Sequence, residues 1–153
     1  MPDADRRSLR YYPPSGPAAE AARAGGFTLP FSAAVRAGDV LYLSGQIGAC
    51  ADGSLPDGIE AQARQAMANI GAVLAEAGLG FGDLFHCLVM LADMDEWGAF
   101  NRVYLEHFDA GRLPARSAFA ATGLALGARV ELECKAWAGQ DRDCPPCLAS
   151  RVC

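Results

Sequence analysis

One stretch of the chain, residues 114–137, holds the charged side chains whose types and spacing best suit chemistry. Arg116 follows a proline turn at the start of an expected strand, and its guanidinium can bind a carboxylate through two parallel hydrogen bonds, which lysine cannot match. Glu131, on the next expected strand, can orient water against an electrophile whose own carboxylate the arginine holds. If the two strands pair, both side chains can lie on one side of the sheet. We therefore take Arg116 and Glu131 as candidate catalytic residues.

Each of these side chains also has a plainer interpretation. Arg116 can be a solvated arginine at a strand start, or it can form a surface ion pair with Glu131 that contributes little to stability. Glu133 lies two residues further on, points to the same face as Glu131 and competes for the role of orienting water. The residues alone leave open which of the two acids would act.

A second short stretch, Ser44-Gly45-Gln46, can add backbone groups to the same site. Glycine lets a ligand approach the main chain closely, so its N–H can donate without a side chain in the way. A glycine within a strand also marks many β-bulges, so the tripeptide alone is a weak indication.

Apolar patterning predicts the strands that would position these residues. A hairpin is expected over residues 31–47, with its turn at Ala37-Gly38-Asp39. Residues 84–91 are nearly continuous in apolar side chains, which indicates a strand buried on both faces. The last two strands are expected over residues 116–122 and 129–137.

Two helices with one apolar stripe each are expected between these strands. The first would begin at a capping-box-like pair, Asp57 and Glu60, and stop at Gly78. The second would begin near residues 93–95 and close at Gly111. The order β-β-α-β-α-β-β predicts an α+β two-layer domain with both helices on one face of a mixed sheet.

The doubly apolar strand also predicts self-association. If the helices cover one face of the sheet, the other face needs burial against another copy of the chain. We therefore expect a symmetric oligomer with the sheets inside.

Length and composition fit one folded domain, since 52% of the 153 residues are apolar. We expect a flexible arm over residues 1–26, the folded domain over residues 27–139 and a cysteine-rich tail over residues 140–153. No apolar run is long enough for a membrane span and the N-terminus does not resemble a secretory signal, so a cytoplasmic protein is expected. A net charge of −5 without a basic patch disfavours nucleic acid as a partner.

The cysteines divide between the body of the chain and its tail. Cys87 and Cys134 lie in strand-like runs, where cysteine packs as a small apolar residue. Cys144 and Cys147 form a CxxC with Cys153 nearby, but no second CxxC or histidine pair completes a tetrahedral metal set. We predict no metal site and keep a redox or chaperone role of the tail as an alternative.

Five short motifs occur in an order and spacing that resemble a known family. They are SGQ at residues 44–46, Gln62 with Asn69-Ile70, an acidic-aromatic-asparagine segment at 93–104, PARS at 114–117 and VELE at 130–133. On these motifs the chain resembles the Rid family, the YjgF-like reactive-intermediate deaminases once labelled endoribonucleases. The resemblance covers about residues 31–138, and PARS followed by the acidic strand is its most specific part.

The resemblance implies a chorismate-mutase-like fold and a homotrimer with clefts between its subunits. It implies hydrolysis of 2-imino or enamino acids, such as 2-aminoacrylate, to 2-keto acids and ammonia, without a metal or organic cofactor. Carried over by position, Arg116 would hold the substrate carboxylate and Glu131 would orient the attacking water. The substrate-binding positions would be Phe31, Ser44, Gly45, Asn101 and Ala118.

Three positions depart from the family pattern. Phe31 stands where deaminases of this type commonly have a tyrosine, so one hydroxyl is missing. Ala118 stands where a cysteine is common, and residues 124–126 lack the usual proline of the last turn. These departures indicate a divergent member whose substrate differs from the simple imine.

Two further function classes stay open. One is a non-catalytic binder of small carboxylates that uses Arg116 as an anchor, which the missing hydroxyl at Phe31 would suit. The other is RNA cleavage, suggested by the old family label. The acidic charge and the lack of a histidine pair for acid–base work on ribose argue against RNA cleavage.

Overall fold

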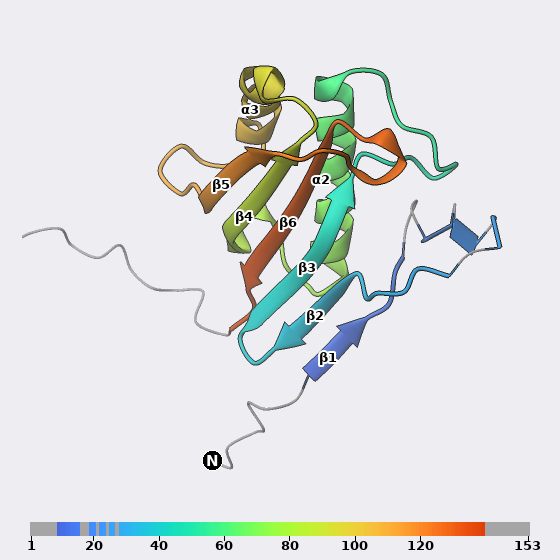
Figure 1. Ribbon diagram of the computed structural model, residues 1–153. Helices are drawn as coiled ribbons and strands as arrows, with labels where there is room; N and C mark the ends of the chain where they lie inside the picture. Colours follow the sequence, from blue (N-terminus) through green and yellow to red (C-terminus); the bar gives the residue numbers. More distant parts are fainter. Residues whose placement is uncertain (1–8, 16–18, 21, 24, 27, 140–153) are drawn as a thin grey trace, which may run out of the picture.

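The strands assemble into one mixed sheet whose order, among the described residues, is β1-β2-β3-β6-β4-β5 (Figure 1). The computed structural model describes residues 9–15, 19–20, 22–23, 25–26 and 28–139. The strands are β1 (Leu9–Tyr12), β2 (Ala34–Ala37), β3 (Val40–Ile47), β4 (Leu84–Leu91), β5 (Ala115–Ala120) and β6 (Val130–Trp137). All neighbouring strands are antiparallel except β4 and β5, which are parallel.

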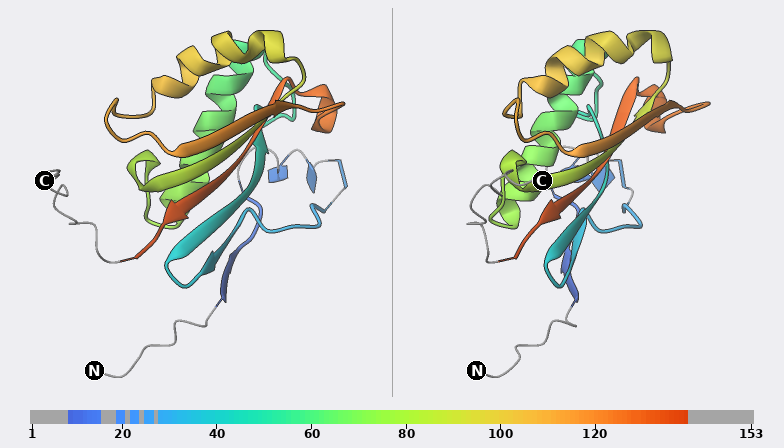
Figure 2. Two further views of the ribbon diagram at one scale, coloured as in Figure 1. Left: turned by 60° about the vertical axis from the view of Figure 1, so that its left-hand side comes forward. Right: turned by 90° about the vertical axis from the view of Figure 1, so that its left-hand side faces the viewer.

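Two helices, α2 (Ile59–Glu76) and α3 (Trp97–Leu105), lie on the same face of this sheet (Figure 2). Short 3₁₀ turns at Phe81–Asp83, Met94–Glu96 and Ala125–Gly127 connect the elements. The prediction of an α+β two-layer domain is confirmed. In the described part of the chain, no helix is both long and apolar enough to cross a membrane.

Alternation along the strands and helical spacing along α2 build the core between the two layers. The helix-facing residues of β6 are at most 1% exposed: Val130, Leu132, Cys134 and Ala136. The stripe of α2 is equally buried: Ala63, Met67, Ile70 and Leu74. Full burial of each large apolar side chain contributes roughly 1.5–3 kcal/mol, so this layer contact holds the sheet in place under the helices.

β1 is a strand that the sequence did not predict. Leu9–Tyr12 were expected in a flexible arm, but they pair antiparallel with β2, and the Tyr12 side chain is buried. β2 itself begins at Ala34, three residues later than predicted, so Phe31 lies ahead of the strand. The turn at Gly38 is confirmed, because this glycine has a φ of 60° between β2 and β3. The predicted cysteine-rich tail lies outside the described residues.

The helix boundaries differ from the prediction at three ends. α2 begins after Gly58, whose position carries no side-chain cap, so the predicted capping box is wrong. Its end is confirmed, because Gly78 follows it with a φ of 73°. α3 begins later and ends earlier than expected, since a 3₁₀ turn over Met94–Glu96 precedes it and its last residue is Leu105.

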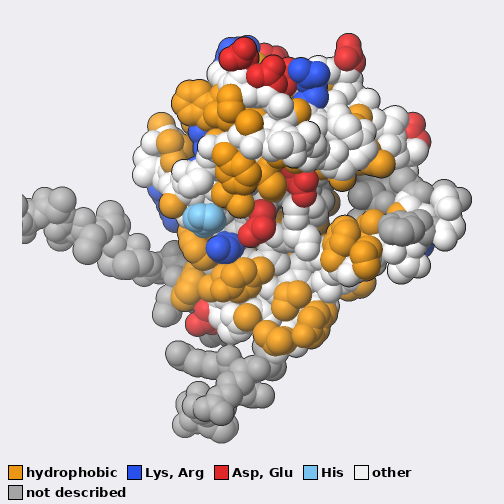
Figure 3. All heavy atoms as spheres, in the orientation of Figure 1, with side chains coloured by type: hydrophobic (Ala, Val, Ile, Leu, Met, Phe, Trp, Pro, Cys, Tyr) orange, Lys and Arg blue, Asp and Glu red, His pale blue; other side chains and the backbone are white. Residues whose placement is uncertain are grey.

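β4 is buried on one face only within a single chain. Cys87, Val89 and Leu91 face the helices and are not exposed, whereas the side chains between them on the other face are partly exposed. Hydrophobic side chains gather on this open face of the sheet (Figure 3). The prediction of strict two-sided burial is therefore wrong for one chain, and burial of the open face against other copies stays a prediction.

Candidate functional site

The two candidate catalytic residues lie on opposite faces of the sheet. β4 lies between β5 and β6, so the strands of Arg116 and Glu131 do not pair. Arg116 is in register with Cys87, which faces the helices, and Glu131 is in register with Met90 on the open face. The prediction that adjoining strands bring the two side chains together within one chain is therefore wrong, because β5 pairs with β4 in parallel and becomes the edge strand.

Glu131 lies against the backbone of Gly45. A Cβ atom at Gly45 would collide with Oε1 of Glu131, so only glycine leaves room for this carboxylate. Burial raises the pKa of Glu131, and the negative charge of Glu133 raises it further. No described residue donates a hydrogen bond to the Glu131 carboxylate or forms an ion pair with it. We call Phe31, Ser44, Gly45 and Glu131 the acid half-site.

A β-bulge brings the glycine to this position. The register of β3 against β6 shifts at Ser44 and Gly45, so these two residues stand opposite the single residue Glu133. The Ser44 hydroxyl donates to the carbonyl oxygen of Ser32 at 2.7 Å. This bond ties the segment that carries Phe31 to the bulge, and it occupies the Ser44 side chain.

The acid half-site opens into a cavity of about 650 Å³. Phe31, Gly45 and Glu131 line it together with mostly apolar side chains such as Ile47 and Leu126. Among the described residues that line it there is no arginine, lysine or histidine. The cavity can therefore hold an apolar group beside Glu131, but its described lining offers no cation to a carboxylate.

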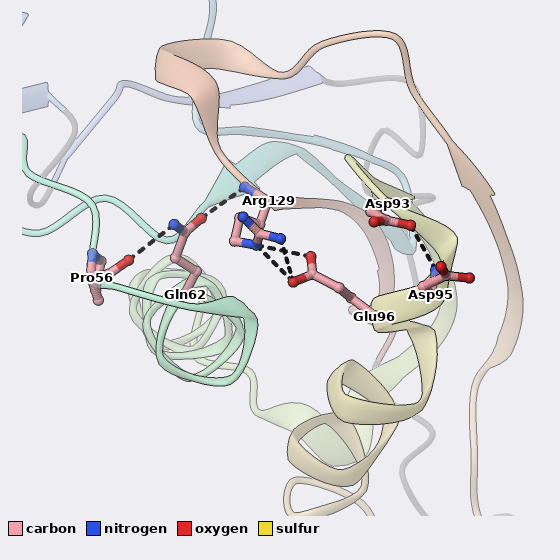
Figure 4. Close-up of polar contacts among 6 residues, drawn as sticks. All are labelled: Pro56, Gln62, Asp93, Asp95, Glu96 and Arg129. Atoms are coloured by element: carbon pink, nitrogen blue, oxygen red, sulfur yellow. Dashed lines mark hydrogen bonds and ion pairs between the residues drawn. The ribbon is translucent and has the colours of Figure 1, made fainter.

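A hydrogen-bond network holds the start of β6, the strand that carries Glu131 (Figure 4). Nε of Arg129 donates to the two carboxylate oxygens of Glu96 at 2.8 and 2.9 Å. The side chain of Gln62 accepts from the Arg129 N–H at 2.8 Å and donates to the carbonyl oxygen of Pro56 at 3.0 Å. The strand is therefore tied to α2 and to the turn before α3, two residues ahead of the carboxylate.

Arg116 is held against three aromatic rings of α3. Its guanidinium carbon lies 4.7 Å from the ring centroid of Tyr104, 5.7 Å from that of Phe100 and 5.9 Å from that of Trp97. Rings at these distances attract a cation and fix its direction. Within the described part of the chain, no carboxylate forms an ion pair with Arg116. Its N–H groups are therefore left to bind a ligand.

Asn101 and Ala118 lie on the arginine side of the molecule. Asn101 lies on α3 at helical spacing from the rings, and its Oδ1 atom is buried without a hydrogen-bond partner among the described residues. Ala118 follows Arg116 by two residues on β5 and packs half-buried against the core. We call Arg116, Asn101 and Ala118 the arginine half-site.

Two buried thiols lie on the neighbouring strands. The Sγ atoms of Cys87 and Cys134 are 3.4 Å apart, and both cysteines are free. Their prediction as small buried residues is confirmed.

Burial, with a smaller effect from the Cys87 thiol, raises the pKa of Tyr104 far above its ordinary range. The Tyr104 hydroxyl therefore stays protonated and does not act as a base.

Sequence reasoning placed Gln62 and Asn69 in a family motif but did not identify them as the residues that position the acid half-site. Asn69 donates to the carbonyl oxygens of Ile47 and Ala49, both at 3.0 Å, and so holds the end of β3. Gln62 does the same for the start of β6. These are the two buried polar side chains among the described residues. The signal was available, because a glutamine and an asparagine at helical spacing on the apolar stripe of α2 must find hydrogen-bond partners.

Metal ligation finds no support in this geometry. Among the described residues, no three histidine, cysteine, aspartate or glutamate side chains come together as a metal site. What the arrangement offers chemically is a carboxylate with a raised pKa in one half-site and, in the other, a guanidinium that no described carboxylate pairs with.

Known proteins resemble the chain over most of its length. The family model described as endoribonuclease L-PSP matches residues 23–138. A mouse protein named 2-iminobutanoate/2-iminopropanoate deaminase is 41% identical over 106 residues, which cover 68% of this chain and 78% of the mouse protein.

Solved structures have the same fold. An endoribonuclease L-PSP protein from Entamoeba histolytica is 36% identical, with a TM-score of 0.73 over 85% of this chain and 99% of that one. TdcF from E. coli, solved with bound serine, is 26% identical, with a TM-score of 0.73 over 85% of this chain and all of that one.

Proposed function

The chain belongs to the endoribonuclease L-PSP family, and on that premise we propose that it hydrolyses 2-imino and enamino acids of the 2-aminoacrylate type to 2-keto acids and ammonia. One observation carries the proposal: the Glu131 carboxylate, which has a raised pKa and no hydrogen-bond or ion-pair partner among the described residues, lies over Gly45 and lines a cavity. The names of the relatives support it, because the mouse protein is named as a deaminase of two such imines.

Glu131 is the group that handles protons in this proposal. It accepts a proton from water while the water oxygen forms a bond to C2 of the imine, the C2–N double bond becomes a single bond, and the nitrogen takes up a proton from solvent. The same carboxyl then gives its proton to the nitrogen, the C2–N bond breaks and ammonia leaves, and the hydroxyl group on C2 loses its proton to solvent as the carbonyl forms. A raised pKa suits both steps, because the group must lose and regain a proton in one turnover.

Arg116 binds the substrate carboxylate. Its planar guanidinium makes two parallel hydrogen bonds to a carboxylate, and the α3 rings hold it in one direction. Asn101 and the backbone of Gly45 complete the contacts to the ligand. Ala118 and Phe31 shape the two walls.

The site is assembled from two copies of the chain. In one chain Arg116 lies on the helix side of the edge strand β5, and Glu131 lies on the open face two strands away. Neither half-site can therefore bind and hydrolyse the substrate alone. We place the arginine half-site of one copy against the acid half-site of the next in a homotrimer.

The open face of the sheet supports such an assembly. Large apolar side chains on its strands are 42–46% exposed, which is unusual for a surface left to water: Tyr42, Phe85, Phe119 and Trp137. Packing of these strands against other copies would bury them.

A non-catalytic carboxylate binder is the second candidate. It is favoured by Phe31, which lines the cavity without a hydroxyl to donate to substrate or water. Such a binder would use Arg116 in the same way, but it would release no ammonia.

The deciding experiment measures keto-acid release when a serine dehydratase generates 2-aminoacrylate in the same solution. Wild type should accelerate release over the uncatalysed rate, and Glu131→Gln should lose roughly 10²–10⁴-fold in kcat, the usual contribution of general acid–base catalysis. The matched control is Glu133→Gln, because Glu133 is the neighbouring exposed acid on the same face.

Each outcome assigns the role. Loss of turnover in Glu131→Gln alone supports the proposal, and loss in Glu133→Gln alone moves the proton-handling role to Glu133. Wild type that binds 2-keto acids without any acceleration would make the chain a carboxylate binder.

A further inference from the structure

The cavity beside Glu131 is much larger than a three- or four-carbon imino acid needs. Its volume is about 650 Å³. At roughly 30 Å³ per water-sized group it has room for about twenty such groups. A 2-aminoacrylate bound at Glu131 would leave most of this space filled only with water.

The N-terminal segment forms one wall of the cavity. Pro14, Ser15, Ala19 and Ala22 line it, and they precede residue 23, where the family match begins. Tyr12, just before them, is buried, and β1 is paired with β2, so the wall has a fixed base. Part of this wall therefore lies ahead of the residues that the family model matches.

Another part of the cavity lining carries a strained leucine. Leu126 has a φ of 58°, the one positive φ of a non-glycine residue among those described, and its side chain is 72% exposed while lining the cavity. A leucine in the left-handed region costs of order 1 kcal/mol or more and persists where a site uses it. An apolar ligand group in the cavity would cover this side chain.

Charge restricts what the cavity can accept. Asp52 and Glu131 are the acids of its lining, and the described lining residues supply no cation. An acidic substrate side chain would therefore be repelled. The remaining lining is mainly apolar, and its largest hydrophobic side chains are Leu29, Phe31, Ile47 and Leu126.

From these observations we propose that the substrate is a 2-imino acid with a large apolar side chain, of the phenylalanine or long branched type, and that this side chain fills the cavity between the N-terminal segment and Leu126. The inference rests on the proposed deaminase function and specifies its substrate. The imine carbon would lie at Glu131, with the carboxylate pointing out of the cavity toward Arg116 of the neighbouring copy.

The test compares two imines of different size. D-amino-acid oxidase generates the imino acid of phenylalanine from D-phenylalanine and 2-iminopropanoate from D-alanine, and semicarbazide traps whatever imine remains. The protein should hydrolyse the phenylalanine imine with a kcat/KM at least about tenfold higher, since each well-buried methylene group already contributes about tenfold.

A cavity-filling variant locates the preference. Ala125 is exposed and lines the cavity, so Ala125→Trp should reduce the ratio of the two kcat/KM values by about tenfold or more. Ala68 is exposed on α2 and does not line the cavity, so Ala68→Trp should leave the ratio unchanged. Melting curves establish that both variants are folded.

The outcomes separate this inference from the function on which it rests. Faster hydrolysis of 2-iminopropanoate, or an unchanged ratio in folded Ala125→Trp, overturns the inference and leaves the deaminase standing. Failure to hydrolyse either imine overturns the deaminase and this inference with it.

Discussion

The acid half-site and the arginine half-site place one charge each in opposite surroundings. Glu131 lies beside a roomy apolar cavity, with no hydrogen bond from a described residue and a backbone glycine beneath it. Arg116 does not line this cavity, and three rings within 6 Å hold its guanidinium instead. One half-site offers space without a cation, and the other offers a cation that is already oriented.

Within one chain the two charges are kept apart. β4 lies between the strands that carry Arg116 and Glu131, and the two side chains lie on opposite faces of the sheet. A ligand with a carboxylate at one end and an imine carbon beside it can connect the two groups when two copies meet.

Of the three effects predicted from this comparison, the largest is expected from a change that keeps the charge of the arginine half-site but removes its planar guanidinium. Arg116→Lys should lower kcat/KM for imine hydrolysis by roughly 100-fold, because a point charge replaces two parallel hydrogen bonds and part of the ring contact. Steady-state kinetics on the wild type and the variant measure this loss. The matched control is Arg112→Lys, an exposed arginine outside both half-sites, which should behave as wild type. Equal kinetics for Arg116→Lys and wild type would remove the arginine half-site from the reaction.

A smaller effect is expected from a change that displaces the Glu131 carboxylate from its position over Gly45. Gly45→Ala should lower kcat by about tenfold, since the added Cβ forces Glu131 away from its position and small misplacements of a catalytic group are costly. Gly82→Ala is the matched control, because a Cβ at that exposed glycine meets nothing within 4 Å. If Gly45→Ala retained full activity with an unchanged melting temperature, the contact between Gly45 and Glu131 would have no role.

The smallest effect concerns stability and its dependence on pH. The folded chain raises the pKa of Glu131, so ionisation of this group disfavours the folded state. The contribution of the Glu131 carboxyl to folding stability is fully present below its pKa in the unfolded chain. It is lost as the pH rises through its pKa in the folded chain. Glu131→Gln cannot ionise, so it should melt at a slightly higher temperature than wild type at neutral pH, and the difference should vanish in acid.

Thermal melts between acid and neutral pH test this expectation. Asp109→Asn, at an exposed loop position outside both half-sites, serves as the control for loss of one negative charge. A Glu131→Gln variant that melts below wild type at neutral pH would show that the carboxylate is stabilised in the fold, contrary to the account.

Much of the fold could be predicted from local patterns. The apolar stripe of α2 and the alternation of β6 each follow from burial of one face, and both were found where expected. β1 could not be predicted, because Leu9–Tyr12 carry no period of their own and become a strand only through pairing with β2. The order of the core elements could thus be predicted from the sequence. The edge strand β1, which forms only by pairing with β2, could not.

The site could be predicted as residues but not as geometry. Arg116 and Glu131 were identified from side-chain chemistry and family resemblance, and their roles stay predictions. Consecutive strands pair more often than not, and the predicted placement relied on that tendency. The placement was wrong because β5 and β6 do not pair. Here the parallel contact between β4 and β5 moves Arg116 to the sheet edge. That contact depends on long-range packing, which cannot be predicted from the spacing of residues within 114–137.

The most direct test of a site shared between copies mixes two inactive variants. Arg116→Ala and Glu131→Gln homo-oligomers are unfolded together and refolded as hybrids, and imine hydrolysis is compared with that of each variant refolded alone. In a closed ring with random mixing, about a quarter of the clefts receive an intact arginine half-site from one copy and an intact acid half-site from the next, so about a quarter of wild-type activity should return. Hybrids that form, as mass spectrometry would establish, and yet stay as inactive as their parents would contradict the account.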